Sequence, residues 1–166
     1  MRKYEKRSSY MTYLPSKEII LSMSGLEFMK KIENGKLPAA PIAHTLNYEL
    51  KHVAEGQVIF SGSPNFNAMN PMGSVHGGWY GTLLDSAMAC AIMTKVPKGS
   101  VYTTLEYKIN IIKPIPSNMQ IDAIGEVSHV GRSTGTAEGK IIGTEDKILY
   151  ATGSTTCIIM PLVSNK

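Results

Sequence analysis

Hydrophobic and polar positions divide this chain into a helical middle and a β-rich second half. From Trp79 to Met93 nearly every residue is apolar or small, and the single charge is Asp85. A helix that is apolar on almost every face is buried. From 119 to 130, by contrast, apolar and polar residues alternate, which is the period of a strand with one buried face. The pattern predicts a buried helix over 77–95, ending before Pro97, followed by a meander of strands.

The remaining pattern predicts one helix and two strands ahead of the buried helix. Ser24 and Glu27 fit a capping box at the start of the first helix. Strands are expected over 43–54, 57–61, 101–112, 119–130, 134–143 and 147–160. Short links between successive strands favour antiparallel pairing. We therefore expect an α+β fold in which a curved antiparallel sheet wraps the apolar helix. An extension over 1–42 with one extra helix precedes a domain over 43–166.

Composition limits the partners of this domain. The 166 residues are 43% hydrophobic and only 18% charged, which suggests that part of the surface is covered by a second subunit. A single sheet around one helix also leaves edges for a second copy to cover. The net charge of +4 comes from scattered Lys and Arg, which argues against nucleic-acid binding. It suits phosphorylated small molecules, including coenzyme A.

The cysteines and the N-terminal residues indicate a cytoplasmic protein. Cys90 and Cys157 lie in apolar stretches and are expected to be reduced core thiols, and no metal-ligand spacing occurs. The first residues are basic but lack the apolar region of a signal peptide. No apolar run approaches the roughly 20 residues of a membrane span.

Asp85 needs an explanation of its own. A buried carboxylate is costly unless it is paired, hydrogen-bonded or protonated, so it marks a candidate site. Taken with the helix alone, a bond to neighbouring Ser86 or Thr82 explains it equally well. Just before the helix, Gly73, Gly77 and Gly78 allow backbone to lie close to a ligand at its N-terminus.

These residues belong to a longer motif. Asn70-Pro-Met-Gly-Ser-Val-His-Gly-Gly, followed by Leu-Leu-Asp85 on a small-residue helix, resembles the hotdog-fold acyl-CoA thioesterases of the phenylacetate-degradation (PaaI-like) type. The likeness extends over about 43–160. The resemblance implies a hotdog fold, a homodimer that often pairs into a homotetramer, and hydrolysis of acyl-CoA without metal or cofactor, CoA being part of the substrate.

The resemblance gives the central residues their roles. Asp85 is the candidate general base or nucleophile, and the family leaves open which. The Gly77 N–H is the candidate donor to the thioester carbonyl, since the first N–H groups of a helix lack intrahelical partners. Close packing of the loop would also explain Gly77 and Gly78. The eight residues from Gly77 to Asp85 span about 12 Å of helix, so a shared substrate requires a second subunit.

The supporting residues each admit two interpretations. Asn70 orients water or the carbonyl, or it bonds its own loop. Thr104 matches the position where the family often places Ser or Thr beside the carboxylate, with Thr103 as a competitor on the opposite face. His76 is included among the catalytic candidates, although a structural role in the loop before the helix is favoured.

The substrate-binding candidates lie at the helix start, in a turn and after a strand. Gly78, Arg132, Ser133 and Lys113 are assigned to CoA, the turn at 130–133 resembling the family's CoA-lining hairpin. A solvated turn charge explains Arg132 and Lys113 equally well. Residues 79, 80, 84 and 88 are expected to line the acyl pocket, unless they are ordinary core.

Two other functions compete with thioester hydrolysis. A hotdog hydratase or dehydratase needs a catalytic His beside the carboxylate, and the other histidines are isolated in this sequence. A non-catalytic acyl-CoA binding protein would gain by replacing Asp85 with an apolar residue.

Overall fold

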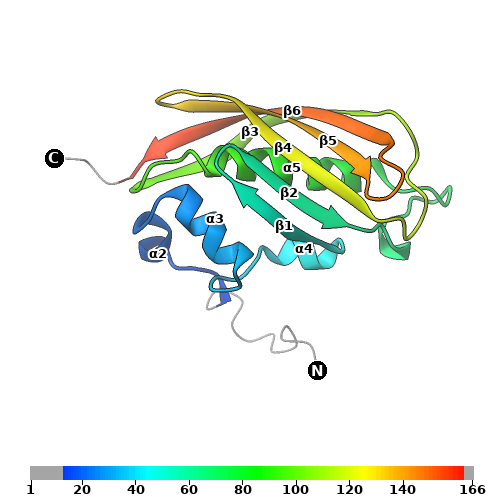
Figure 1. Cartoon of the computed structure of the whole chain (residues 1–166), viewed down its shortest axis with the longest axis horizontal. Coiled ribbons are helices and arrows are strands. Elements are labelled where there is room, and N and C mark those ends of the chain that lie inside the picture. The colour runs from blue at the N-terminus through cyan, green and yellow to red at the C-terminus, as the bar shows by residue number, and fades with distance from the viewer. Residues whose placement is uncertain (1–12, 163–166) are drawn as a thin grey trace.

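The computed structural model describes residues 13–162. Its centre is a six-stranded antiparallel sheet that curves around one long helix (Figure 1). The helix is α5 (Gly77–Met93), and the sheet order is β1-β2-β4-β5-β6-β3. The strands are β1 (Tyr48–Ala54), β2 (Gln57–Gly62), β3 (Ser100–Ile111), β4 (Ile121–Val130), β5 (Thr134–Gly143) and β6 (Leu149–Pro161). The predicted architecture and the order of the elements from β1 onward are confirmed.

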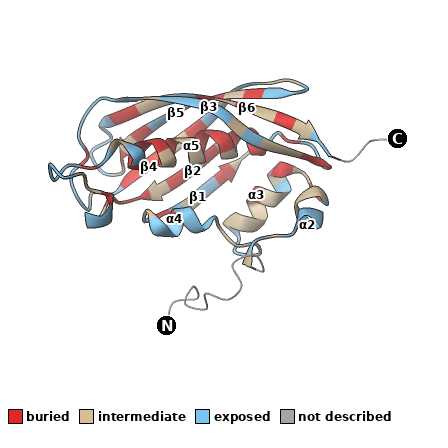
Figure 2. Ribbon diagram, turned by 180° about the vertical axis from the view of Figure 1, so that it is seen from behind, coloured by how far each residue is buried: buried red, intermediate tan, exposed pale blue. Residues whose placement is uncertain are grey.

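Helix α5 packs closely on the sheet because a row of glycines lies beneath it. Gly125, Gly139 and Gly153 are register partners across β4, β5 and β6. A Cβ at Gly125 would lie 2.2 Å from the Ala87 carbonyl oxygen of α5, and one at Gly139 would lie 2.7 Å from Met88. Figure 2 shows the resulting core, with buried residues along the length of α5.

The N-terminal part contains more helix than the sequence predicts. In place of one helix between residues 13 and 43, the structure has α2 (Lys17–Leu21) and α3 (Gly25–Glu33), and α4 (Pro41–Thr45) begins there. The predicted cap of α3 is confirmed, since the Ser24 hydroxyl accepts from the Glu27 N–H at 3.3 Å. A short 3-10 helix, η1 (Phe66–Ala68), lies in the loop before α5.

The predicted strand over 43–54 is wrong over residues 43–47, because β1 begins at Tyr48. Pro41 occupies the first turn of α4, where a missing N–H costs nothing. Two residues past its end, Asn47 has φ 57°, the left-handed conformation that ends helices. Proline before and asparagine after a short segment were the signal for this helix.

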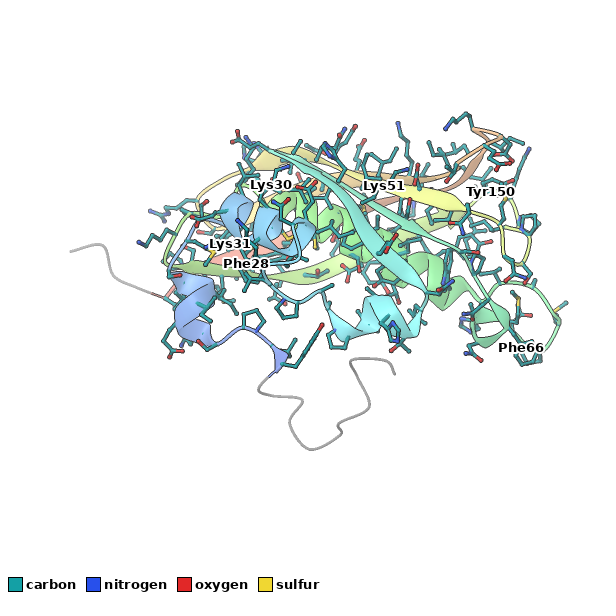
Figure 3. The ribbon with its side chains drawn as sticks, turned by 60° about the horizontal axis from the view of Figure 1, so that its bottom comes forward. Phe28, Lys30, Lys31, Lys51, Phe66 and Tyr150 are labelled. Carbon is teal, nitrogen blue, oxygen red and sulfur yellow. The ribbon has the colours of Figure 1, made fainter. Side chains whose placement is uncertain are left out.

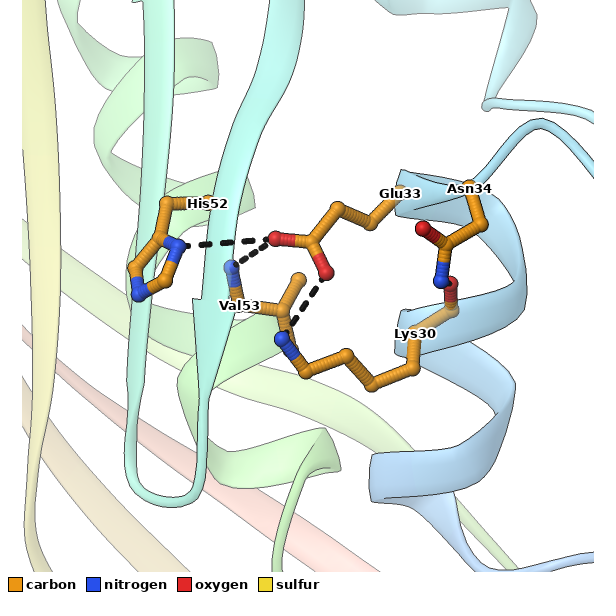
Figure 4. A network of polar contacts seen from close by, with 5 residues as sticks. All are labelled: Lys30, Glu33, Asn34, His52 and Val53. Carbon is orange, nitrogen blue, oxygen red and sulfur yellow. Dashed lines mark hydrogen bonds and ion pairs between the residues drawn. The ribbon is translucent and has the colours of Figure 1, made fainter.

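The two edges of the sheet differ. At β1, the Val53 N–H donates to the Glu33 carboxylate of α3 at 2.8 Å, so helix covers this edge (Figure 4). At β3, no described strand or helix pairs with the outer side, and Leu105, Tyr107 and Ile111 are exposed. A long apolar edge strand is a surface that a second chain can pair with.

Candidate active site

Asp85 lies in the middle of α5 on the side that the sheet leaves partly open. Its side chain is half-buried, and its Oδ1 accepts a hydrogen bond from the Thr104 hydroxyl at 2.9 Å. Thr104 comes from β3 and also lies 3.8 Å from the Cys157 sulfur. The expected proximity of Thr104 to the carboxylate is therefore present, whereas Thr103 is exposed.

The surroundings of Asp85 favour its protonated form more than water does. Burial raises the pKa of the Asp85 carboxyl above its ordinary value, and the hydrogen bond from Thr104 partly opposes this rise. A raised pKa makes a carboxylate a stronger base once it is ionised. Thr104 thus holds the carboxylate in place and favours its ionised form.

The N-terminus of α5 carries one unused donor. The His76 Nδ1 accepts from the Gly78 N–H at 2.9 Å, and the His76 carbonyl accepts from the Trp79 N–H at 2.9 Å. Within residues 13–162 the Gly77 N–H has no hydrogen-bond partner. Since the helix dipole favours negative charge here, Gly77 offers a donor for a developing oxyanion.

His76 serves as the N-cap of α5. Its Nδ1 is committed as an acceptor, so this nitrogen carries no proton in the arrangement observed. The geometry matches the structural role, fixing the loop before the helix, that the sequence favours.

Asn70 organises the loop that leads to α5. Its amide oxygen accepts from the Met72 and Ser74 N–H groups, at 2.9 and 3.2 Å. Its amide nitrogen donates to the Ser74 hydroxyl at 2.8 Å. The amide oxygen and the amide nitrogen of Asn70 are thus both hydrogen-bonded within the loop. Asn70 therefore fixes the backbone of the loop that leads to Gly77.

A β-bulge in β3 brings a residue to this face that sequence periodicity misses. The pairing of β3 with β6 shifts between Thr104 and Glu106, which reverses the alternation after Leu105. Thr104 before the bulge and Tyr107 after it can therefore both face α5. The Tyr107 hydroxyl lies 3.2 Å from where a Cβ of Gly81 would stand, between Gly77 and Asp85 on the helix.

The comparisons with known proteins bear on the family and the fold. The family model described as the thioesterase superfamily matches residues 72–149, from the loop before α5 to the start of β6. The comparison with curated proteins finds no match. The family match indicates a thioester hydrolase.

Solved structures match over most of their length. One is the PaaI protein of the phenylacetic acid degradation operon of E. coli, 19% identical, covering 81% of this chain and 95% of that one, with a TM-score of 0.70. A putative thioesterase related to phenylacetic acid degradation, from Ralstonia eutropha, is 22% identical over 79% and 98%, with a TM-score of 0.71. A thioesterase from Haemophilus influenzae is 18% identical over 84% and 93%, with a TM-score of 0.70.

The chain has the hotdog fold. At these identities the structural likeness establishes the fold alone, and the family match adds the thioesterase character. The resemblance to PaaI-like thioesterases that the Asn70–Asp85 motif suggests is confirmed.

Within one hotdog subunit the proposed CoA residues do not come together. Arg132 and Ser133 form the exposed turn between β4 and β5. The next residue, Thr134, is the register partner of Ile158 in β6, which in turn is the partner of Thr103 near the start of β3. Lys113 follows the far end of β3 and is also exposed. Gly78 lies near the end of β3 that precedes Lys113, because a Cβ on the adjacent Gly77 would lie 3.6 Å from the Ile111 side chain of β3.

The residues expected to line the acyl pocket lie in the core of the subunit, as their alternative interpretation has it. The Trp79 indole donates to the Leu46 carbonyl at 2.8 Å, and the Tyr80 hydroxyl accepts from the Ile115 N–H at 2.8 Å. Leu84 and Met88 are fully buried against the glycine row. These side chains of α5 therefore hold the fold together.

Two other features bear on ligands and location. The described residues contain no group of three or more His, Cys, Asp or Glu side chains arranged to hold a metal ion. None of the described helices combines the length and apolar character that crossing a membrane needs.

Proposed function

We propose that this protein hydrolyses acyl-CoA thioesters to a free acid and CoA, with Asp85 as general base or nucleophile. The observation that carries the proposal is Asp85 itself. It is the one charge on an otherwise apolar helix, half-buried, held by Thr104 and shifted toward a useful pKa. A binding protein with no chemistry to perform would gain stability from an apolar residue at this position.

The carbonyl is polarised in this proposal by the Gly77 N–H of a second subunit. Gly77 and Asp85 lie about 12 Å apart along α5, so one thioester carbon cannot meet both from the same chain. In a two-fold dimer with antiparallel copies of α5, Gly77 of each copy approaches Asp85 of the other. Each dimer then holds two equivalent sites.

The open edge supports such a dimer. β3 has 12 residues and carries exposed Leu105, Tyr107 and Ile111, whereas helix α3 covers the opposite edge. Antiparallel pairing of β3 with its own copy would bury these side chains and satisfy the free backbone groups. It would also bring the Lys113 end of one subunit toward the Arg132 end of the other, uniting the proposed CoA residues. We propose a further pairing of dimers into a tetramer.

The proposed location is the cytoplasm. Cys90 and Cys157 are both free thiols, which suits a reducing compartment.

The decisive experiment removes the Gly77 N–H without changing the helix. Gly77→Pro deletes this donor, and proline is well tolerated at the first position of a helix. His76 has φ −65° and ψ 137°, the extended conformation that a following proline requires. Gly77→Ala is the matched control, because a Cβ there meets Ile111 at 3.6 Å, an ordinary contact, and keeps the N–H.

Free-thiol release from an acyl-CoA panel measures the result. Gly77→Pro should lower kcat by about 10²–10³-fold, the cost of one lost oxyanion donor, while Gly77→Ala stays near wild type. Equal activity of the proline and alanine variants would contradict the role of this N–H. Absence of turnover by the wild-type protein on every member of the panel would contradict the proposed function.

Mixing two inactive variants tests the shared site. Asp85→Asn and Gly77→Pro subunits, unfolded and refolded together, should form heterodimers with one intact site and one doubly defective site. Statistical pairing should restore about a quarter of wild-type activity. Activity that stays at the level of the separate variants would place both groups of a site in one chain.

A further inference from the structure

A partly open apolar cavity lies between the N-terminal helices and α5. Its volume is about 210 Å³. One wall is α3, with Phe28, Met29 and Ile32, and the opposite wall is α5. No Lys, Arg, Asp, Glu or His is among its lining residues. Figure 3 shows Phe28 on α3, at the opposite end of the molecule from the exposed Phe66.

The cavity adjoins the candidate catalytic carboxylate. Its α5 wall consists of Ser86, Cys90 and Met93, and Ser86 directly follows Asp85. Tyr102, also in the lining, lies two residues before Thr104 and so faces the same side of β3. An acyl group that enters this space would leave its thioester carbon beside Asp85.

The polar atoms in the lining are already engaged. The Tyr48 and Ser86 hydroxyls hydrogen-bond at 2.9 Å, and the Tyr102 hydroxyl lies 4.0 Å from the Cys90 sulfur. Burial raises the pKa of the Cys90 thiol to about 12, so it is neutral. The surface offered to a ligand is therefore uncharged and mainly hydrocarbon, which disfavours acyl groups that carry a second carboxylate.

The α3 wall is fixed at both ends. At its start, the Gly25 N–H donates to the Val96 carbonyl at 2.9 Å, and a Cβ on Gly25 would collide with the Met93 carbonyl of α5. At its end, Glu33 accepts from the Val53 N–H and pairs with Lys30, both at 2.8 Å (Figure 4). A wall anchored in this way is pre-formed, as ligand pockets usually are.

We propose that this cavity is the acyl subsite and that α3 and α4 set the acyl length. An apolar cavity of about 150 Å³ binds benzene, so this larger space fits an unbranched or aromatic acyl group of roughly eight carbons. The inference rests on the proposed thioesterase function. It gives the N-terminal helices, which lie outside the 72–149 match, the role of specificity elements.

Filling the cavity tests the assignment. Ala43 of α4 is buried in the lining, and Ala43→Leu adds three carbons to it. Ala54→Leu, at the end of β1 and outside the lining, is the matched control. Wild-type kcat/KM should rise by up to about fourfold per added carbon from acetyl- to octanoyl-CoA and then stop rising. Ala43→Leu should lower kcat/KM at least about tenfold for octanoyl-CoA, while kcat/KM for acetyl-CoA should stay within about twofold of the wild-type value.

Enlarging the cavity gives an independent variant should Ala43→Leu not fold. Phe28→Ala should move the preferred chain length to longer acyl groups, toward dodecanoyl-CoA. Equal changes across the panel, or no change, in both variants would overturn the subsite while leaving the hydrolysis intact.

A binding measurement separates this inference from the proposed function. Octanoic acid, titrated by calorimetry, should bind wild type and the Ala54→Leu control but lose at least about tenfold in affinity in Ala43→Leu. Binding with this pattern in a protein without turnover would retain the subsite and overturn the hydrolase. Equal binding to all three proteins would overturn the subsite.

Discussion

The two faces of α5 have opposite properties although the helix looks uniform in sequence. Toward the sheet, Leu84 and Met88 are fully buried against Gly139 and Gly153, with no space between them. On the side that faces the open β3 edge, Gly78 is exposed and Thr82 and Asp85 are half-buried. One face is packed as tightly as a protein interior allows, and the other keeps small side chains and a carboxylate within reach of a ligand.

This difference teaches how the fold makes a buried helix usable for chemistry. The sheet supplies the burial that raises the pKa of Asp85, while the small residues beside it leave room for a substrate and for a second subunit. The glycines of the sheet beneath α5 allow close packing. The glycines at the start of α5 leave access to the backbone. Substitutions on the two faces should accordingly affect different measurements.

The largest effect is expected on the open face, at Asp85. Asp85→Asn should lower kcat by about 10²–10⁴-fold, the range for a lost general base, without loss of fold. Because burial raises the pKa of Asp85, its ionisation costs folding free energy, and this cost grows as pH rises through the folded-state pKa. The variant should therefore melt at or above the wild-type temperature at neutral pH. Thiol release measures kcat and thermal melts measure the melting temperature, with Asp146→Asn in the β5–β6 hairpin as control.

The next largest effect is expected on the packed face, at Gly125. A Cβ there would meet the Ala87 carbonyl oxygen at 2.2 Å, and backbone cannot give way easily. Gly125→Ala should lower the free energy of unfolding by about 1–3 kcal/mol, as overpacking does. Gly131→Ala, where the nearest atom is 3.4 Å away, is the control in urea unfolding. Equal stability of the two variants would mean that α5 does not lie as close to β4 as the structure has it.

A smaller effect is expected at the start of the helix, where His76 acts as cap. His76→Ala should cost about 0.5–2 kcal/mol of stability, because the Gly78 N–H loses its acceptor. Asparagine is a good N-cap, so His76→Asn should restore both the melting temperature and the turnover. An asparagine variant that is stable but inactive would show that the imidazole takes part in the chemistry.

The smallest effect is expected in the pH profile of Thr104 variants. The hydrogen bond from Thr104 lowers the pKa of Asp85, so Thr104→Val should move the acidic limb of kcat/KM to higher pH. Thr104→Ser keeps the hydroxyl and should leave the limb in place. A Val variant with an unmoved limb would indicate that another group controls it.

Much of this molecule followed from local patterns. The apolar run at 79–93 required a buried helix, the alternation after 119 required strands, and the spacing from Asn70 to Asp85 indicated the family. The errors occurred where short segments carry weak signals. Helix α4 has five residues, too few for a periodicity to emerge, and α2 is equally short. The usable evidence was Pro41 in the first turn of α4 and Ser16 as the N-cap of α2.

The sequence by itself determined the elements, their order and the carboxylate that a buried helix must accommodate. Tertiary structure decided which face of α5 is packed, because an all-round apolar helix has no preferred side until a sheet meets it. It also decided that Thr104 and Tyr107 both reach that helix, since the bulge at Leu105 resets the alternation between them. The cavity beneath α3 is likewise a product of packing, because its walls come from segments that are distant in sequence and that a local pattern cannot relate.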